Sequence, residues 1–239
     1  MTIYYSILFS LGDAKANQYV YCLMLQLRAL VRTKMLGALD QFVLLCDQKT
    51  QKVMEGIAIP PNFKMLLVPS PKTLEEGMML KFAFPRLAKV PEGEQLIYMD
   101  LDMLPIRKIE IDVPANSFVA YPEGRPDDKN YCGDSGLALP AGCSGGFFAY
   151  RWCPAVAALF QEVLERIGWA KEKYYTLDQP HYNRALAAHI ACVKFFPHEI
   201  VSFNGNTNQK TAAFINCCGD PGDSGFHFRK MLEFFLRAL

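Results

Sequence analysis

The first part of the chain alternates between short apolar runs and amphipathic segments, and this alternation constrains the fold more than any other feature. Residues 3–9, 42–46, 64–68 and 95–99 are apolar at most positions, as in strands that are buried on both faces of a sheet. This order predicts an α/β fold with a mostly parallel central sheet flanked by helices. The intervening helices are expected over residues 14–34, 48–56 and 80–89, the last one started or kinked by Pro85.

The second half of the chain is less regular. A strand is predicted over residues 146–150, and helices are predicted over residues 154–167, 178–189 and 228–239. Residues 122–142 are rich in Gly, Pro, Asp and Asn, which indicates a long surface loop. Loops of this length in a compact domain are often binding loops or lids.

The length and the charge balance limit the class of protein. A chain of 239 residues with 51% hydrophobic residues can build one substantial core, so we expect a single domain over residues 1–239. Its 25 basic and 24 acidic residues give a formal net charge of +1. This balance argues against a surface built for nucleic acid or for an anionic membrane.

The cysteines indicate a reducing compartment. Eight are present, several lie inside apolar runs, and no Cys-x-x-Cys pair occurs. Reduced thiols that act as small core residues fit this pattern better than a zinc site or a disulfide framework. The first residues resemble a core strand rather than a signal peptide, and no stretch is long enough to span a bilayer. We therefore expect a cytoplasmic location.

Two carboxylates follow the fourth apolar run. Asp100 and Asp102 are separated by one residue, and in an extended segment both can face one cation. Carboxylate oxygens suit Mg²⁺ or Mn²⁺, and the carboxyl edge of a parallel sheet is where ligands bind. The alternative is a solvated turn that ends the strand. From context alone, neither interpretation is favoured.

Five segments in order resemble the motifs of one enzyme family. They are residues 79–82, 97–102, 143–150, 177–183 and 225–228. They are spread over nearly the whole chain and are similar to the motifs of the glycogenin-like retaining glycosyltransferases of family eight, which have a GT-A fold and a DXD motif. The resemblance implies a Rossmann-related GT-A domain.

The resemblance also implies an activity. It is the transfer of a sugar from a nucleotide-sugar donor to a glycan or protein-linked acceptor, with retention of configuration. UDP is the first expectation for the nucleotide and GDP the second. Residues 1–105 would form the nucleotide-binding half, and residues 106–239 would bind the sugar and the acceptor. A homo-oligomer and a larger multidomain chain are both compatible with the sequence.

The family's functional residues can be carried over one by one. The resemblance makes Asp178 and Gln179 catalytic, and it makes Asp100, Asp102 and His227 the ligands of Mn²⁺ or Mg²⁺. The remaining donor-binding residues that it implies are Phe9, Leu11, Asp13, Tyr19, Lys81, Leu101, Ser144, Gly145, Gly146 and Lys230.

The chain departs from the family pattern at three places. Residues 144–146 read Ser-Gly-Gly where the family has Asn-Ser-Gly, so fewer side chains reach the sugar. The tyrosine that stacks on the base is displaced by one turn, to Tyr19. The late Gly-x-x-Lys-Pro-Trp is absent, and only Arg229 and Lys230 follow His227.

Other interpretations of these residues stay open. Asp178 could be a helix N-cap, and Lys81 could be a solvated helix lysine. A sugar-phosphate nucleotidyltransferase is an alternative enzyme class, but it would need a Gly- and Arg-rich loop at residues 10–13, which read Ser-Leu-Gly-Asp. A non-catalytic domain that binds a sugar or a partner is the third possibility.

Overall fold

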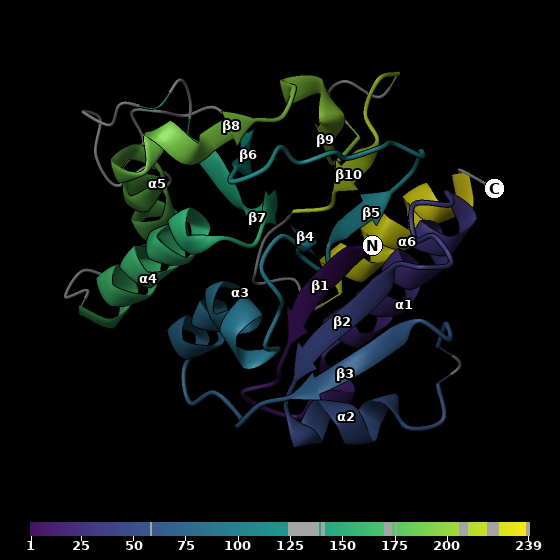
Figure 1. Cartoon of the computed structure of the whole chain (residues 1–239). Coiled ribbons are helices and arrows are strands. Elements are labelled where there is room, and N and C mark those ends of the chain that lie inside the picture. The colour runs from purple at the N-terminus through teal and green to yellow at the C-terminus, as the bar shows by residue number, and fades with distance from the viewer. Residues whose placement is uncertain are drawn as a thin grey trace. The chain divides into compact units, whose positions relative to one another are not determined.

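The computed structural model describes residues 1–57, 59–123, 139, 142–169, 174, 176–205, 210–218 and 225–237. Within these residues the fold is α/β, with a mostly parallel seven-stranded sheet in the order β3-β2-β1-β4-β7-β6-β8 (Figure 1). Its strands are β1 (Thr2–Leu8), β2 (Gln41–Cys46), β3 (Phe63–Leu67), β4 (Gln95–Met99), β6 (Phe118–Pro122), β7 (Cys143–Arg151) and β8 (Val193–Phe195).

A second sheet in the described residues has three short strands in the order β5-β10-β9. They are β5 (Met103–Pro105), β9 (Val201–Phe203) and β10 (Phe214–Asn216). The helices are α1 (Gln18–Arg32), α2 (Gln48–Met54), α3 (Leu74–Leu87), α4 (Pro154–Trp169), α5 (Gln179–Ala188) and α6 (Phe226–Arg237).

The predicted α/β class with a mostly parallel sheet and flanking helices is confirmed. The first four predicted strands agree with β1 to β4 to within one residue at each end. The sequence did not indicate β5, β6, β8, β9 or β10. Four of these, β5, β8, β9 and β10, have three residues each, too few to show a period. Of the predicted loop over residues 122–142, residues 124–138, 140 and 141 lie outside the described residues.

The chain divides into two compact units, and each unit is assembled from three separate segments. The first unit comprises Met1–Ile3, Lys72–Tyr98 and Asp112–His198, and the second unit comprises Tyr4–Pro71, Met99–Ile111 and Glu199–Leu239. Each unit therefore draws on both halves of the sequence, so neither corresponds to residues 1–105 or 106–239.

The core of the first unit is aromatic. Phe148, on β7, lies at the centre of a cluster in which the ring centroids of Tyr98, Phe118, Tyr182 and Phe82 are 4.9, 5.3, 5.8 and 5.9 Å away. Aromatic pairs at such distances add to the stabilisation that their burial provides. The cluster fixes β7 in place, and β7 also carries the Ser-Gly-Gly segment at its start.

Helix α3 begins earlier than the sequence pattern indicated. We expected a helix from residue 80, with Pro85 at its start or at a kink, but Pro85 lies inside a helix that begins at Leu74. The early start has a clear cause, because the side chain of Thr73 accepts a hydrogen bond from Glu76 N and the side chain of Glu76 accepts one from Lys72 N. This arrangement resembles a capping box, which satisfies backbone donors at a helix start.

The second unit contains a pair of parallel strands and a helix whose first turn is capped by a polar side chain. β2 and β3 are parallel, and the rings of Phe42 and Phe63 stack at 5.8 Å across them. Asn17 caps α1 by accepting a hydrogen bond from Tyr19 N. Such a cap is worth about 1 kcal/mol.

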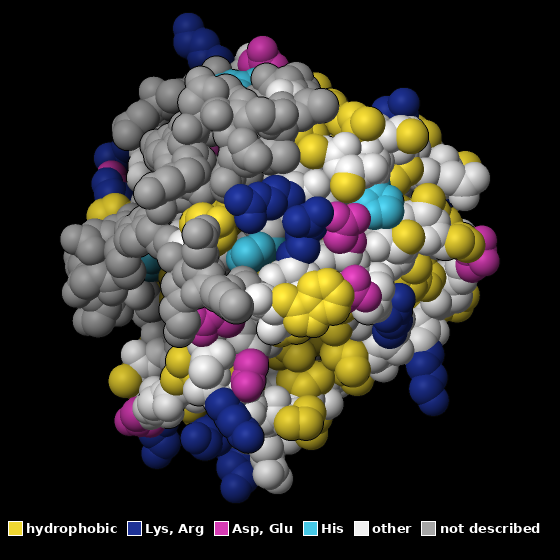
Figure 2. Space-filling view, turned by 90° about the vertical axis from the view of Figure 1, so that its left-hand side faces the viewer, with side chains coloured by type: hydrophobic (Ala, Val, Ile, Leu, Met, Phe, Trp, Pro, Cys, Tyr) yellow, Lys and Arg dark blue, Asp and Glu magenta, His cyan; other side chains and the backbone are white. Residues whose placement is uncertain are grey.

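The surface of the described residues agrees with the near-neutral composition. Figure 2 shows Lys and Arg side chains next to Asp, Glu and His side chains on the face that it draws. None of the helices among the described residues is long and apolar enough to cross a membrane.

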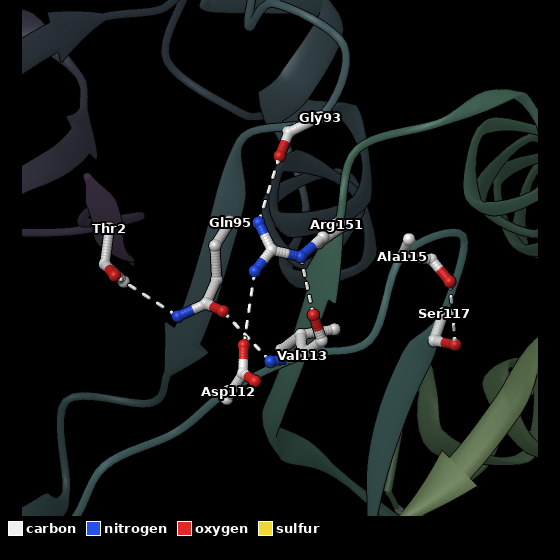
Figure 3. Close-up of polar contacts among 8 residues, drawn as sticks. All are labelled: Thr2, Gly93, Gln95, Asp112, Val113, Ala115, Ser117 and Arg151. Atoms are coloured by element: carbon white, nitrogen blue, oxygen red, sulfur yellow. Dashed lines mark hydrogen bonds and ion pairs between the residues drawn. The ribbon is translucent and has the colours of Figure 1, made fainter.

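In the first unit, a hydrogen-bond network holds residues 112–117 against the starts of β1 and β4 and the end of β7 (Figure 3). The buried side chain of Gln95 accepts a hydrogen bond from Val113 N at 3.0 Å and donates one to Thr2 Oγ1 at 3.2 Å. Arg151 donates to Val113 O at 2.6 Å and pairs with Asp112 at 3.2 Å. Both groups of the Val113 backbone are thereby satisfied.

We expect Gln95→Met to destabilise the chain, because methionine fills the same volume but leaves the Val113 N–H without this acceptor. An unsatisfied buried donor costs about 1–3 kcal/mol. Urea unfolding followed by circular dichroism measures the loss. Gln48→Met, at an exposed position, is the matched control, and an equal effect of the two substitutions would contradict the role of the network.

Candidate functional site

The Asp-x-Asp pair lies in a tight turn between two strands. β4 is buried throughout and ends at Met99, and β5 begins at Met103. Met103 N donates to Asp100 O at 3.1 Å and closes the turn. The expectation of an extended segment is therefore wrong, because this hydrogen bond curls the backbone between the carboxylates. Leu101, predicted to bind the donor, is buried, whereas Asp100 and Asp102 are partly exposed.

His227 lies beside Asp102, as the order of the motifs predicted. His227 is in the first turn of α6, and its Nδ1 is 2.8 Å from Cys217 O and 3.2 Å from Asp102 Oδ2. A carbonyl and a carboxylate can only accept hydrogen bonds, so Nδ1 must carry a proton. In the neutral imidazole the lone pair is then on Nε2, so Nε2 is the atom that could ligate a metal.

The surroundings of His227 favour its charged form. Burial by itself lowers the pKa of the imidazole, but the hydrogen bond and the charge of Asp102 raise it, with further contributions from the Cys217 carbonyl and the charge of Asp100. The net result is a pKa above the ordinary value. The carboxylate charges that raise this pKa also favour a bound cation at the turn.

Tyr19 extends the same cluster. Its ring centroid is 5.2 Å from that of His227. The pKa of the phenol is raised, mainly by burial and then by the charges of Asp102 and Asp100. Tyr19 therefore stays neutral.

These residues fit a divalent cation through the chemistry of their donor atoms. Asp102 offers carboxylate oxygen and His227 an imidazole nitrogen, a combination that Mn²⁺ accepts readily. Among the described residues, no group of three or more His, Cys, Asp and Glu side chains is already arranged around one point. Asp102 and His227 thus form a pair, and Asp100 stays a predicted third ligand.

The second unit also contains other residues that were predicted to bind the nucleotide-sugar donor. Phe9 directly follows β1, and Leu11 is exposed. Asp13 caps the short helix η1 (Ala14–Ala16) with its side chain. Lys230 lies on α6 and its ammonium is 3.6 Å from a carboxylate oxygen of Glu233.

In the first unit, the structure brings together three of the other predicted residues. Lys81 Nζ is 2.8 Å from Asp178 Oδ2 and donates a hydrogen bond to Gly145 O at 2.9 Å. The side chains of Lys81 and Asp178 are only 2% and 6% exposed. Lys81 is therefore not a solvated helix lysine.

Gly145 allows the ion pair to pack against the backbone of β7. A Cβ atom at Gly145 would lie 3.0 Å from Asp178 Oδ2 and 3.3 Å from Lys81 Nζ. Both distances are tighter than ordinary contacts, so a side chain at position 145 would displace the pair. Ser144 Oγ accepts a hydrogen bond from Gly146 N at 3.2 Å, so the three residues of the Ser-Gly-Gly segment have distinct structural roles.

Asp178 does not cap α5 with its side chain. It occupies the N-cap position, but no capping hydrogen bond is present and its carboxylate pairs with Lys81 instead. The preceding residue, Leu177, has a φ of 54°, a left-handed conformation that is uncommon for leucine. Such strain concentrates at functional sites.

Two residues near this pair were not singled out from the sequence. Glu123 accepts a hydrogen bond from Gln179 Nε2 at 2.8 Å, and because a carboxylate only accepts, it fixes which end of the Gln179 amide faces it. Asn183 bonds both backbone groups of Cys143 and also the Gln179 carbonyl. Asn183 lies within the motif 177–183, so its position in the motif could have indicated it.

The predicted residues thus form two clusters in different units. Asp100, Asp102, His227 and Tyr19 belong to the second unit, and Lys81, Asp178 and Gly145 belong to the first. Comparison of the sequence with models of known protein families and with curated proteins gave no match.

The Lys81–Asp178 pair generates a stability prediction. Asp178→Asn leaves the Lys81 charge buried without its counter-charge, and breaking a buried pair from one side costs about 3–5 kcal/mol. Lys81→Met should cost a similar amount, and the double variant should cost less than the sum. Urea unfolding of all four proteins gives the coupling energy.

The exposed pair of Arg237 and Glu233 provides the control for this cycle. It joins residues on one face of α6, and Glu233→Gln should cost no more than about 0.5 kcal/mol. Additive effects of Lys81→Met and Asp178→Asn would contradict a coupled buried pair.

His227 generates a prediction about pH. Its folded-state pKa lies above 6.5, so the proton stabilises the fold fully below that pH, and the contribution is lost as the pH rises through the folded-state pKa. The difference in unfolding free energy between wild type and His227→Gln should therefore be larger at about pH 5.5 than at about pH 9.

Urea unfolding in EDTA measures this difference without interference from metal ions. The same substitution at the exposed His198 is the control. A difference for His227→Gln that does not change with pH would show that Asp102 does not hold the imidazole in its charged form.

Proposed function

We propose that this chain is a metal-dependent glycosyltransferase of the GT-A type. It would transfer a sugar from a nucleotide-sugar donor, with UDP as the first expectation, to a glycan or protein-linked acceptor. The observation that carries the proposal is the contact between Asp102 and His227, which are far apart in the sequence. The resemblance requires a late histidine to complete the site of the Asp-x-Asp pair, and nothing in the local sequence demands this contact.

In this proposal the second unit holds the cation. Asp100, Asp102 and His227 would be the ligands of Mn²⁺ or Mg²⁺. The ion would supply charge stabilisation for the departing nucleoside diphosphate. Tyr19 would contact the nucleotide at the same turn, because its ring packs beside His227.

The proposed catalytic residues are Asp178 and Gln179. Asp178 would face the anomeric carbon and stabilise the positive charge that develops there, and Gln179 would act beside it. Lys81 would orient the Asp178 carboxylate through their 2.8 Å ion pair. The strained backbone at Leu177 supports a functional role for this corner.

The alternative enzyme class fits less well. A nucleotidyltransferase would need a phosphate-binding loop after β1, but Asp13 in that place uses its carboxylate to accept a hydrogen bond from Lys15 N. Non-catalytic sugar binding by the same fold is tested by the experiment below.

We also propose a reducing, cytoplasm-like compartment. The seven cysteines of the described residues are free, and five of them are buried. Burial raises the pKa of Cys46 to about 12, so this thiol stays protonated and unreactive.

The proposed activity predicts release of nucleoside diphosphate from one member of a panel of nucleotide sugars, with Mn²⁺ present and not in EDTA. Asp102→Asn keeps the size of the side chain but removes its charge, so the rate should fall by at least about 100-fold. Asp112→Asn, at a well-exposed carboxylate, should leave the rate unchanged.

Each failure of this experiment has a distinct meaning. Turnover that persists in EDTA would exclude the metal. Tight binding of a nucleotide sugar without turnover, by a folded wild-type protein, would favour the non-catalytic alternative.

A further inference from the structure

A buried glutamine donates hydrogen bonds to the turn that carries the two carboxylates. Gln26, on α1, is 0% exposed. Its Nε2 donates to Asp100 O at 2.7 Å and to Met103 O at 2.9 Å. These carbonyls belong to the first and last residues of the turn, so one amide group bridges its two ends.

A second buried side chain supports the same arrangement. Ser6, on β1, is also 0% exposed, and its hydroxyl donates to Met99 O at 2.6 Å. The hydroxyl is 3.3 Å from Gln26 Oε1. The carbonyls of Met99, Asp100 and Met103 are therefore all bound by side chains from outside the turn.

The orientation of the Gln26 amide follows from chemistry. Carbonyl oxygens only accept hydrogen bonds, so the NH₂ group must face the turn and the amide oxygen must face Ser6. Both hydrogens of the NH₂ group are used, so only one orientation of the amide satisfies its donors. A buried amide is costly unless it is paired in this way.

An apolar residue would fill this place on α1 more simply. The helix is otherwise apolar on its buried face, with neighbours such as Leu23, Leu27 and Leu30. Packing alone therefore does not account for a glutamine here. What the amide adds is a fixed distance between two backbone carbonyls that flank the carboxylates.

We propose that Gln26 is a positioning residue for the metal site, an inference that rests on the proposed function. By fixing the backbone at both ends of the turn, it sets the directions in which the side chains of Asp100 and Asp102 leave the backbone. Groups behind the ligands of a metal orient them, and their loss weakens metal binding even when the ligands remain.

The test measures metal binding directly, without turnover. Gln26→Met keeps the length and volume of the side chain and removes both donors. We expect its affinity for Mn²⁺, measured by calorimetry, to fall by about 10- to 100-fold. The electron paramagnetic resonance spectrum of the bound Mn²⁺ should also change, because the ligand geometry is altered.

Gln95→Met is the matched control. Gln95 is also a buried glutamine whose side chain makes two hydrogen bonds, but these go to Thr2 and Val113 (Figure 3). Both variants lose stability, so a fall in Mn²⁺ affinity that is confined to Gln26→Met separates positioning from general destabilisation. Circular dichroism confirms that each variant is folded during the titration.

Ser6→Ala covers the case in which Gln26→Met does not fold. It removes the support behind Gln26, so its Mn²⁺ affinity should lie between those of wild type and Gln26→Met. Wild-type Mn²⁺ affinity in folded Gln26→Met, or in Ser6→Ala if Gln26→Met does not fold, would overturn the inference while leaving the proposed function intact. A wild-type protein that binds no Mn²⁺ would overturn both.

Discussion

The candidate metal site depends on one constraint, which is that the polar backbone groups around the end of β4 need hydrogen-bond partners when they are buried. β4 is fully buried, yet the chain must leave it and turn at once into β5. Side chains of α1 and β1 donate hydrogen bonds to backbone carbonyls at this point, and Cys217 N donates to the Asp102 carbonyl. The turn is consequently rigid where its carboxylates begin.

Buried charge in the first unit obeys the same rule. The Lys81 ammonium and the Asp178 carboxylate are nearly excluded from water, and each is paired with the other. Gly145 lets this pair approach the backbone of β7, which a side chain would prevent. The close packing of Gly145, Lys81 and Asp178 therefore fixes how the three elements that carry them are arranged at this point.

The sequence predicted the long elements and part of each cluster. The strands β1 to β4 follow from local apolar runs, and the pairing of His227 with Asp102 agrees with the order of motifs. Gln26 was missed because a glutamine in an amphipathic helix looks like a solvated residue, and its partners are backbone atoms that no pattern reveals. The start of α3 was missed although Thr73 and Glu76 carry the capping signal.

The three-stranded sheet sets where His227 can lie. Asn216 pairs with Met103 across β10 and β5, and His227 follows one residue into α6. The end of β10 therefore has a fixed register against the strand that follows the Asp-x-Asp turn. Cys217, directly after β10, completes this link, because its N–H donates to the Asp102 carbonyl and its own carbonyl accepts a hydrogen bond from His227 Nδ1. The imidazole is therefore held to the Asp-x-Asp turn through the backbone of one residue as well as through the Asp102 carboxylate.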